Sequence, residues 1–388
     1  MKVKPKLIRM SSLYSGLGLF IFFIIMQLTY WLPLRFWGIS GFGNFIDTQQ
    51  VLRWSECYIT KGDLIFQNHG ECAGYIYGST LIRILSFLDI TQSSTLLFGY
   101  FFMLILAITI SSQAGMIDKF RTNPYLLAIV LSPPVLLLAE RANLDILILG
   151  LIALTGLLFI QGYHTWALFP LSLATLFKFY TLPIFAILFL FNDNKRKIFT
   201  STIGLMVSLR VFLDLQLIQS SFPGGAGAKF GVSIWAPKIS EVFDSDLGKL
   251  LANLSGVIVL TLISVTTLIV LKKTGISISS QFVGNNPTRI YFYLFFGVHL
   301  SCYLSGASYD YRLIFLVIAS IIYLDSLSSK SESLYNVVLV MTLLSLWLTY
   351  PSSGLAPIGD LTTGALTFIL TIRLIQLIKL DLRVKFAK

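Results

Sequence analysis

Charged residues are scarce in this sequence, and their scarcity excludes an ordinary soluble protein. Asp, Glu, Lys and Arg make up 12% of the 388 residues, against about a quarter in a typical globular domain. Hydrophobic residues make up 55%, and the mean hydropathy is +0.80. We therefore expect an integral-membrane protein, formed by a single membrane domain over residues 1–388.

Acidic residues are the scarcer charged kind: there are 18 of them against 29 basic residues, which gives a formal net charge of +11. In a soluble protein this balance would suggest nucleic acid as a partner. Here the basic residues cluster at the ends of apolar runs, where they orient membrane helices. Membrane lipid is therefore the expected partner, and nucleic acid is not.

Several short catalytic motifs are also missing. The chain has no Gly-x-Ser-x-Gly elbow, no His-Glu-x-x-His pair and no Rossmann glycine pattern. The glycine-rich stretch 222–231 lacks P-loop spacing, so we interpret it as a flexible linker, with a mobile substrate lid as the alternative. Three Cys and three His occur without CxxC or HxxxH spacing, so a zinc site is not expected.

Long apolar runs, in contrast, recur along the whole chain. A helix needs about 20 apolar residues to cross a bilayer, and on this ruler the runs predict an all-α bundle of about twelve membrane helices. They cover residues 13–34, 93–113, 124–139, 144–161, 166–178, 181–193, 198–218, 249–271, 290–306, 313–325, 335–350 and 361–378. Short or proline-interrupted runs such as 124–139 are typical of helices that line a membrane-embedded site.

The basic clusters predict the orientation of these helices. The N-terminus is basic, and alternating from a cytoplasmic start places the short Lys and Arg clusters inside, as the positive-inside rule requires. Both termini are then cytoplasmic. Residues 35–92 form a large first outer loop, in which we expect short helices.

Glu140–Asp145 places charges between two apolar runs, and charges at such positions mark a functional site by default. Arg141 and Asp145 are four residues apart, so on a helix they would share a face and could form an ion pair. The functional alternative is that Arg141 binds a phosphate while Asn143 and Asp145 bind sugar hydroxyls.

Other polar residues fall at the same predicted outer side. Asp47 lies on an expected helix, 45–60, and is either a solvated loop acid or a general base. Lys178 either extends to the membrane interface or serves the site, and Asp310 and Arg312 repeat this pattern later in the chain. Arg210 and Asp214, inside a predicted span, are better interpreted as a structural pair.

The cysteines divide into a pair and a single residue. Cys57 and Cys72 share the outer loop, where a disulfide between them would restrict the unfolded chain by roughly 3 kcal/mol. Two free, buried thiols are the alternative. Cys302 lies within a predicted span and is expected in the core.

Three segments resemble a known family. The first segment has the order Asp47, Cys57, Gly62-Asp63-Leu64 and Cys72, and it resembles an outer loop in which an acid precedes a Cys-Gly-Asp/Asn run. The second, Glu140–Asp145, resembles a Glu-Arg-Gly-Asn-x-Asp turn with Ala142 in place of glycine. The third, Leu176–Tyr180, resembles a Leu-Lys-x-Tyr-Pro turn. With the large first outer loop, they are similar to the GT-C superfamily of integral-membrane glycosyltransferases. The closest likeness is to the bacterial polyprenyl-phosphate-mannose-type mannosyltransferases.

The resemblance implies a glycosyltransferase of the bacterial inner membrane. Mannose or another hexose or pentose would pass, with inversion, from a polyprenyl-phosphate donor to a glycan or glycolipid acceptor at the outer face. The implied roles are Asp47 as the catalytic base, Arg141, Lys178 and Arg312 on the donor phosphate, and Asn143, Asp145, Tyr180 and Asp310 on the sugar or acceptor. No nucleotide, metal or other cofactor is implied.

Two other functions stay open. A transporter or flippase for a lipid-linked or anionic substrate would suit many spans with embedded charges, but it would place charges along a path through the membrane. The charges here are expected to gather at the outer face, which favours an enzyme. An O-antigen-type polymerase would carry its large outer loop late in the chain, whereas here the largest outer loop is the first.

Overall fold

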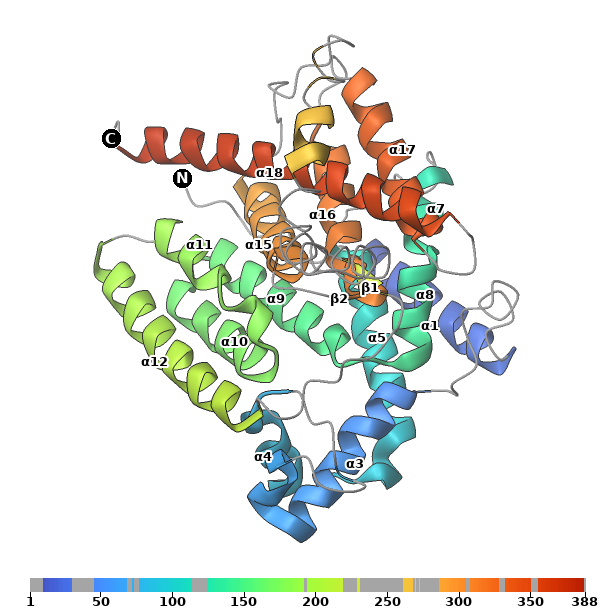
Figure 1. Cartoon of the computed structure of the whole chain (residues 1–388), viewed down its shortest axis with the longest axis vertical. Coiled ribbons are helices and arrows are strands. Elements are labelled where there is room, and N and C mark those ends of the chain that lie inside the picture. Colours follow the sequence, from blue (N-terminus) through green and yellow to red (C-terminus); the bar gives the residue numbers. More distant parts are fainter. Residues whose placement is uncertain are drawn as a thin grey trace, which may run out of the picture. The chain divides into compact units, whose positions relative to one another are not determined.

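A computed structural model describes most of the chain (Figure 1). The described residues are 10–29, 45–67, 72, 77–113, 124–191, 194–218, 229–230, 261–267, 269, 272, 286–304, 308–327, 332–349 and 355–386. Within them the fold is overwhelmingly helical, as the sequence predicts. The one small sheet of the described part pairs β1 (Lys229–Phe230) antiparallel with β2 (Ser308–Tyr309).

Contacts divide the chain into two compact units. Unit 1 consists of residues 1–119 and 136–226, and unit 2 of residues 120–135 and 227–388. The interpretation as one membrane domain stays a prediction. The helices, in chain order, are α1 (Met10–Leu28), α3 (Ile46–Lys61), α4 (Ser79–Phe87), α5 (Thr95–Gln113), α7 (Pro124–Val130), α8 (Pro133–Arg141), α9 (Asp145–Ile160), α10 (His164–Phe177), α11 (Ile184–Phe191), α12 (Asn194–Ile218), α15 (Asn286–Leu304), α16 (Ile314–Ser326), α17 (Glu332–Leu348) and α18 (Ala356–Phe386).

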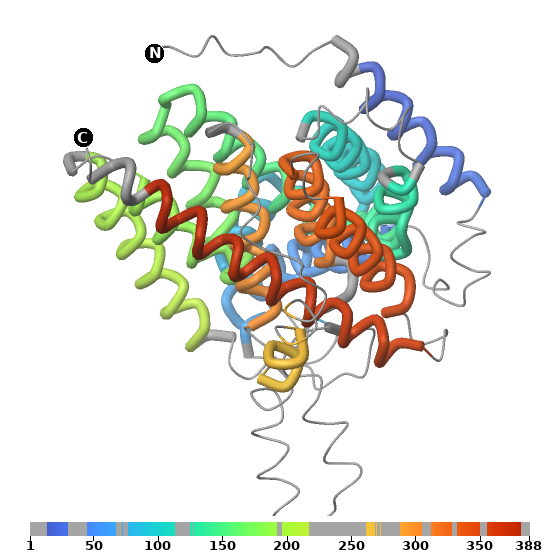
Figure 2. The backbone as a smooth tube through the Cα atoms, turned by 90° about the horizontal axis from the view of Figure 1, so that it is seen from above, coloured from blue at the N-terminus to red at the C-terminus, as the bar shows by residue number. Residues whose placement is uncertain are grey.

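Unit 1 is centred on α9 and α10, which pack closely against each other. The three-residue connection between them ends the first helix at Gly162, whose φ of 87° is a left-handed conformation that favours glycine. Helix α5 packs on α9, α12 packs on α10, and α1 packs on α5 (Figure 2, α9 to α12 in green to yellow-green). This arrangement brings the N-terminus of α9 and the C-terminus of α10 to the same region of unit 1.

Unit 2 is also a packed group of helices. Helix α17 lies on α18, and α15 lies on α16. The Trp347 indole N–H donates to the carbonyl of Ala128 over 3.2 Å, which joins α17 to the short helix α7. Arg289 on α15 pairs with Asp381 on α18 at 2.7 Å.

Three described helices are long and apolar enough to cross a membrane: Gln92–Ser112, Arg196–Gln216 and Ala356–Asp381. A fourth candidate is the bent pair formed by Leu127–Arg141 and Asp145–Ile160. Every predicted run overlaps helical residues of the described part, so the helical character of these runs is confirmed, whereas a bundle of about twelve spans stays a prediction. The run 249–271 lies mostly outside the described residues.

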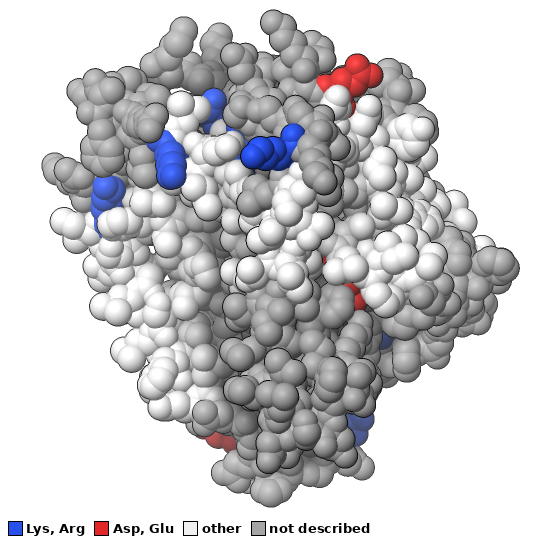
Figure 3. Space-filling view, turned by 45° about the horizontal axis from the view of Figure 1, so that its top comes forward, with Lys and Arg blue, Asp and Glu red and all other residues white. Residues whose placement is uncertain are grey.

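The exposed surface of α12 has the composition of a lipid-facing helix. Seven of its large apolar side chains are between 44% and 72% exposed: Ile198, Phe199, Leu205, Met206, Leu209, Phe212 and Leu213. Such a patch would be unfavourable in water. In the view of Figure 3, charged side chains are sparse among the described residues, as expected for a protein embedded in a membrane.

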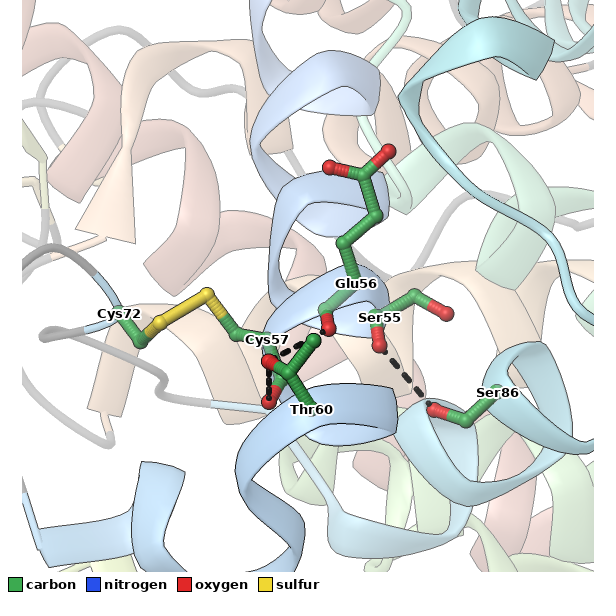
Figure 4. The surroundings of a disulfide bond; sticks show 6 residues. All are labelled: Ser55, Glu56, Cys57, Thr60, Cys72 and Ser86. Carbon is green, nitrogen blue, oxygen red and sulfur yellow. Dashed lines mark hydrogen bonds between the residues drawn. A yellow bond between two sulfur atoms is a disulfide. The ribbon is translucent and has the colours of Figure 1, made fainter.

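The predicted first outer loop contains short helices, as expected. Helix α3 has a buried face at helical spacing, formed by Thr48, Val51, Leu52 and Ser55, and Gly62 caps its C-terminal end. A 3-10 turn, Gly62–Gln67, and then α4 follow. The predicted disulfide between Cys57 and Cys72 is formed, with the Cα atoms 6.0 Å apart (Figure 4). Cys302 is buried, as predicted.

Candidate functional site

The Glu140–Asp145 segment is a sharp break between two helices. Helix α8 ends at Arg141, α9 begins at Asp145, and the helical runs on the two sides meet at an angle of 108°. Ala142 has a φ of 44° at the break, a left-handed conformation that disfavours any residue with a Cβ atom. Glycine would adopt this backbone conformation more readily than Ala142 does.

The break removes one of the alternatives left open by the sequence, an ion pair between Arg141 and Asp145 on one helix face. That pairing requires four residues of continuous helix, and the helix stops between them. Arg141 instead pairs with Asp47, and Asp145 pairs with Lys178. Residues distant in the sequence therefore provide both partners.

The start of α3 is fastened to this break. The Phe45 amide donates to the carbonyl of Glu140 over 2.8 Å, and the Thr48 hydroxyl donates to the carbonyl of Ala142 over 2.5 Å. The Phe45 ring fills the space beside Gly99 on α5, where any Cβ atom would overlap the ring. These anchors place Asp47, which lies between them on α3, directly against Arg141.

Two side chains, Arg141 and Asn143, donate hydrogen bonds to the Asp47 carboxylate. The Arg141 guanidinium donates from Nε to Oδ2 over 2.9 Å and from Nη2 to Oδ1 over 2.5 Å, which is a bidentate pair. Asn143 Nδ2 donates to the same Oδ2 over 2.5 Å. The side chains of Arg141 and Asp47 are 25% and 13% exposed, so this pair lies near the surface of the described structure.

Lys178 forms a second, buried pair. Its Nζ lies 2.6 Å from Oδ1 of Asp145, and the two side chains are 3% and 0% exposed. The Tyr180 hydroxyl donates to that same oxygen over 2.6 Å. The Tyr77 ring covers the ammonium at 4.6 Å, a cation–π contact. The acid lies at a helix N-terminus and the lysine at a helix C-terminus, where the helix dipoles favour their charges.

Asn143 joins the two pairs. Its Oδ1 accepts the backbone N–H of Asp145 over 2.9 Å, which satisfies one of the donors at the start of α9. The same oxygen lies 3.4 Å from Lys178 Nζ, while Nδ2 faces Asp47. Asp47, Arg141, Asn143, Asp145, Lys178 and Tyr180 therefore form one connected network, which we call the polar cluster.

A third ion pair supports the cluster from α12. The predicted pair Arg210–Asp214 is present, at 3.0 Å, with Asp214 completely buried. Asp214 also accepts the backbone N–H of Ser79 over 3.0 Å and its hydroxyl over 2.7 Å. Asp214, on α12, thus caps the start of α4 and fixes the position of Ser79, which is two residues after Tyr77.

Gly78 allows this segment to approach α10. Its N–H donates to the carbonyl of Phe177 over 3.1 Å, and a Cβ atom at this position would overlap the carbonyl oxygen of Leu176. Gly78 lies between Ser79, which bonds to the buried Asp214, and Tyr77, whose ring covers Lys178. The close approach to α10 leaves no room for a larger residue at position 78.

Two predicted site residues belong to unit 2. Asp310 and Arg312 lie in the 3-10 turn Asp310–Leu313, and their roles stay predictions. The roles predicted for the members of the polar cluster also stay predictions. Unit 1 brings six of the predicted site residues together. They are Asp47, Arg141, Asn143, Asp145, Lys178 and Tyr180.

Sequence reasoning missed three contributors: Thr48, Tyr77 and Ser79. Each acts through a contact with a segment distant in the sequence, so no local pattern marks it. The Gly78-Ser79 pair before an apolar helix was a signal for a helix start, but not for the ring over Lys178.

The outer loop has its own smaller charge group. Asp63 accepts from Arg83 and from the Tyr58 hydroxyl, both over 3.1 Å. Burial, and then the bond to Asp63, raises the pKa of the Tyr58 hydroxyl. Asp63 is 67% exposed, so it serves below as a control for Asp47.

The polar cluster has the groups needed to handle an anionic substrate. A carboxylate at its surface can accept a proton, and the adjacent guanidinium can bind phosphate. Among the described residues, no three His, Cys, Asp or Glu side chains are grouped to hold a metal ion. No protein-family model, curated protein or solved structure matches the chain.

Proposed function

We propose that the protein is a membrane glycosyltransferase that moves a sugar from polyprenyl phosphate to an acceptor hydroxyl. The observation that carries this proposal is the contact of Asp47 with Arg141 and Asn143, which joins a carboxylate and a phosphate-binding side chain at a broken helix. Membrane helices interrupted at charged residues are typical of substrate sites.

In the proposed reaction, Asp47 takes the proton of the acceptor hydroxyl. The hydroxyl oxygen then forms a bond to the anomeric carbon of the donor, from the face opposite the phosphate. The bond between that carbon and the phosphate oxygen breaks, and its electron pair leaves with polyprenyl phosphate. The configuration is inverted, and no oxidant or nucleotide is consumed.

Cations stabilise the charge that develops on the leaving phosphate. Within unit 1, Arg141 is the more exposed of the two predicted cations, so we assign it the direct contact with phosphate. Lys178, nearly buried, supports Asn143 and the start of α9. Arg312 belongs to unit 2, and its predicted role on the phosphate stays a prediction.

The proposal includes the finer expectations from the sequence. These are a GT-C-like bundle of about twelve spans in a bacterial inner membrane, with both termini cytoplasmic and the loop 35–92 outside. The disulfide in that loop supports this orientation, because disulfides persist in oxidising compartments. Cysteine-labelling from each side of the membrane tests it: a loop labelled only from the cytoplasm would contradict it.

Replacing Asp47 tests the proposed chemistry. We expect Asp47→Asn to lower the transfer of labelled sugar from polyprenyl phosphate by at least about 100-fold, because a general base contributes at least that much. The thermal unfolding midpoint in detergent should change little. Asp63→Asn, which also removes a charge from the outer loop, is the matched control and should keep full activity. Full transfer by Asp47→Asn would remove this residue from the mechanism.

The broken helix pair also suits a transporter or flippase. This second candidate predicts movement of a lipid-linked or anionic substrate across proteoliposomes without sugar transfer. The two functions are separated by one measurement, in which labelled polyprenyl-phosphate sugar is followed for both transfer and change of leaflet.

A further inference from the structure

The two roles proposed for Arg141 compete with each other. Its guanidinium already donates twice to Asp47, through Nε and Nη2, yet the proposed function, on which this inference rests, also requires it to bind the donor's phosphate. We propose that the phosphate takes Arg141 away from Asp47, so that donor binding itself releases the catalytic base.

Without the donor, Asp47 is poorly placed to accept a proton. Its Oδ1 accepts from Arg141, and its Oδ2 accepts from both Arg141 and Asn143. These bonds occupy lone pairs on both carboxylate oxygens, so the acceptor hydroxyl has to compete with Arg141 for access to them. The base becomes effective when the Arg141 bonds are replaced, while the single bond from Asn143 keeps the carboxylate oriented.

Arg141 is suited to this exchange, and Lys178 is not. Arg141 is 25% exposed and ends α8, next to the break at Ala142. Lys178 is 3% exposed and is enclosed by Asp145 and the Tyr77 ring. A planar guanidinium also binds two oxygens of a phosphate in the same way as two oxygens of a carboxylate, so one partner can replace the other with little rearrangement.

The exchange imposes an order on the reaction. The donor binds first, its phosphate engages Arg141, and Asp47 is released. The acceptor O–H proton then passes to Asp47 as the new oxygen–carbon bond forms and polyprenyl phosphate leaves. Arg141 neutralises the departing phosphate. Asp47 then releases its proton to water, and the return of Arg141 to the carboxylate closes the cycle. The base is therefore active only while a donor is in place.

The test is the affinity of the full chain, in detergent, for a long-chain polyprenyl phosphate, with the matching polyprenol as a control without phosphate. We expect Asp47→Asn to bind the phosphate about tenfold more tightly than the natural chain, because the negative charge that competes for Arg141 is gone. Arg141→Gln should weaken binding. Asp63→Asn, the matched loss of charge, should leave affinity unchanged.

The double variant makes the test specific to Arg141. In an Arg141→Gln background, Asp47→Asn should no longer tighten binding; a gain that persists there reflects general electrostatics and overturns the exchange. Binding that requires Arg141 but is not tightened by Asp47→Asn also overturns it, and leaves the proposed function standing. Failure of every form to prefer the phosphate over the polyprenol overturns the proposed function and this inference together.

Discussion

The two ion pairs of the polar cluster share Asn143 but differ in nearly every other respect. Lys178 and Asp145 are buried, at 3% and 0% exposure, and the same acid oxygen also accepts from Tyr180. Arg141 and Asp47 are 25% and 13% exposed and join segments separated by 94 residues. The buried pair has the character of a fixed support, and the more accessible Arg141–Asp47 pair has the character of a site.

Burial explains the difference in what each pair can do. Inside the protein, a charge separated from its partner keeps its desolvation penalty, so the pair has no accessible alternative. Near the surface, water or an incoming phosphate can replace the lost partner, and the free energy of separation falls. A substrate can therefore exchange with the Arg141–Asp47 pair while the Lys178–Asp145 pair holds the ends of α9 and α10 in place.

The largest predicted effect tests the buried pair. We expect Lys178→Met to lower the free energy of unfolding by about 3–5 kcal/mol, because it leaves the Asp145 carboxylate buried without its cation. Arg141→Gln should lower it by only about 1–2 kcal/mol. Thermal and denaturant unfolding in detergent measure both.

A matched double variant checks the cause. Lys178→Met combined with Asp145→Asn removes both charges, and it should recover much of the stability that the single substitution loses. Equal losses for Lys178→Met and Arg141→Gln would break the distinction between a fixed and an exchangeable pair.

The disulfide supplies the next largest effect. Replacing Cys57 and Cys72 with Ser should lower the free energy of unfolding by up to about 3 kcal/mol, since the bridge closes a loop of 15 residues. The loss belongs to the loop that carries Asp47, so Lys178→Met should add to it independently. Cys302→Ala, which removes a buried thiol of unit 2 that lies outside this disulfide, is the control. If the combined variant loses less free energy of unfolding than the sum of the two separate losses, the disulfide loop and the Lys178–Asp145 pair are not independent.

The sequence predicted the helices and the chemical types of the site residues, but not their pairing. Apolar runs depend on local composition, so α5, α9 and α12 lie where the runs predict them. The spacing of Arg141 and Asp145 left an ion pair between them open, but a four-residue spacing indicates a contact only if the helix continues, and here it breaks.

The contacts of Asp47 lay beyond the reach of local patterns. Its position depends on Phe45 and Thr48, which bond to the backbone of a segment more than 90 residues away in the chain. The same holds for Tyr77 over Lys178. Tertiary contacts decided these features, and no periodicity in one sequence records them.

The smallest predicted effect concerns the residue between the two pairs. Ala142 has a positive φ, so Ala142→Gly should relieve about 1 kcal/mol of backbone strain, offset by about 0.8 kcal/mol for the lost buried methyl group. We expect the unfolding free energy to stay within about 1 kcal/mol of the natural value.

Ala139→Gly is the matched control for this last substitution, because Ala139 is equally buried but lies inside α8. Glycine in a helix interior lowers stability by about 1 kcal/mol, and the lost methyl group adds to that loss rather than offsetting a gain. Ala142→Gly should therefore be the more stable of the two variants. If the order is reversed, the methyl group of Ala142 contributes more through packing than its backbone conformation costs. Packing around Ala142 would then stabilise the break between α8 and α9. That packing would connect the two ion pairs in addition to the hydrogen bonds of Asn143.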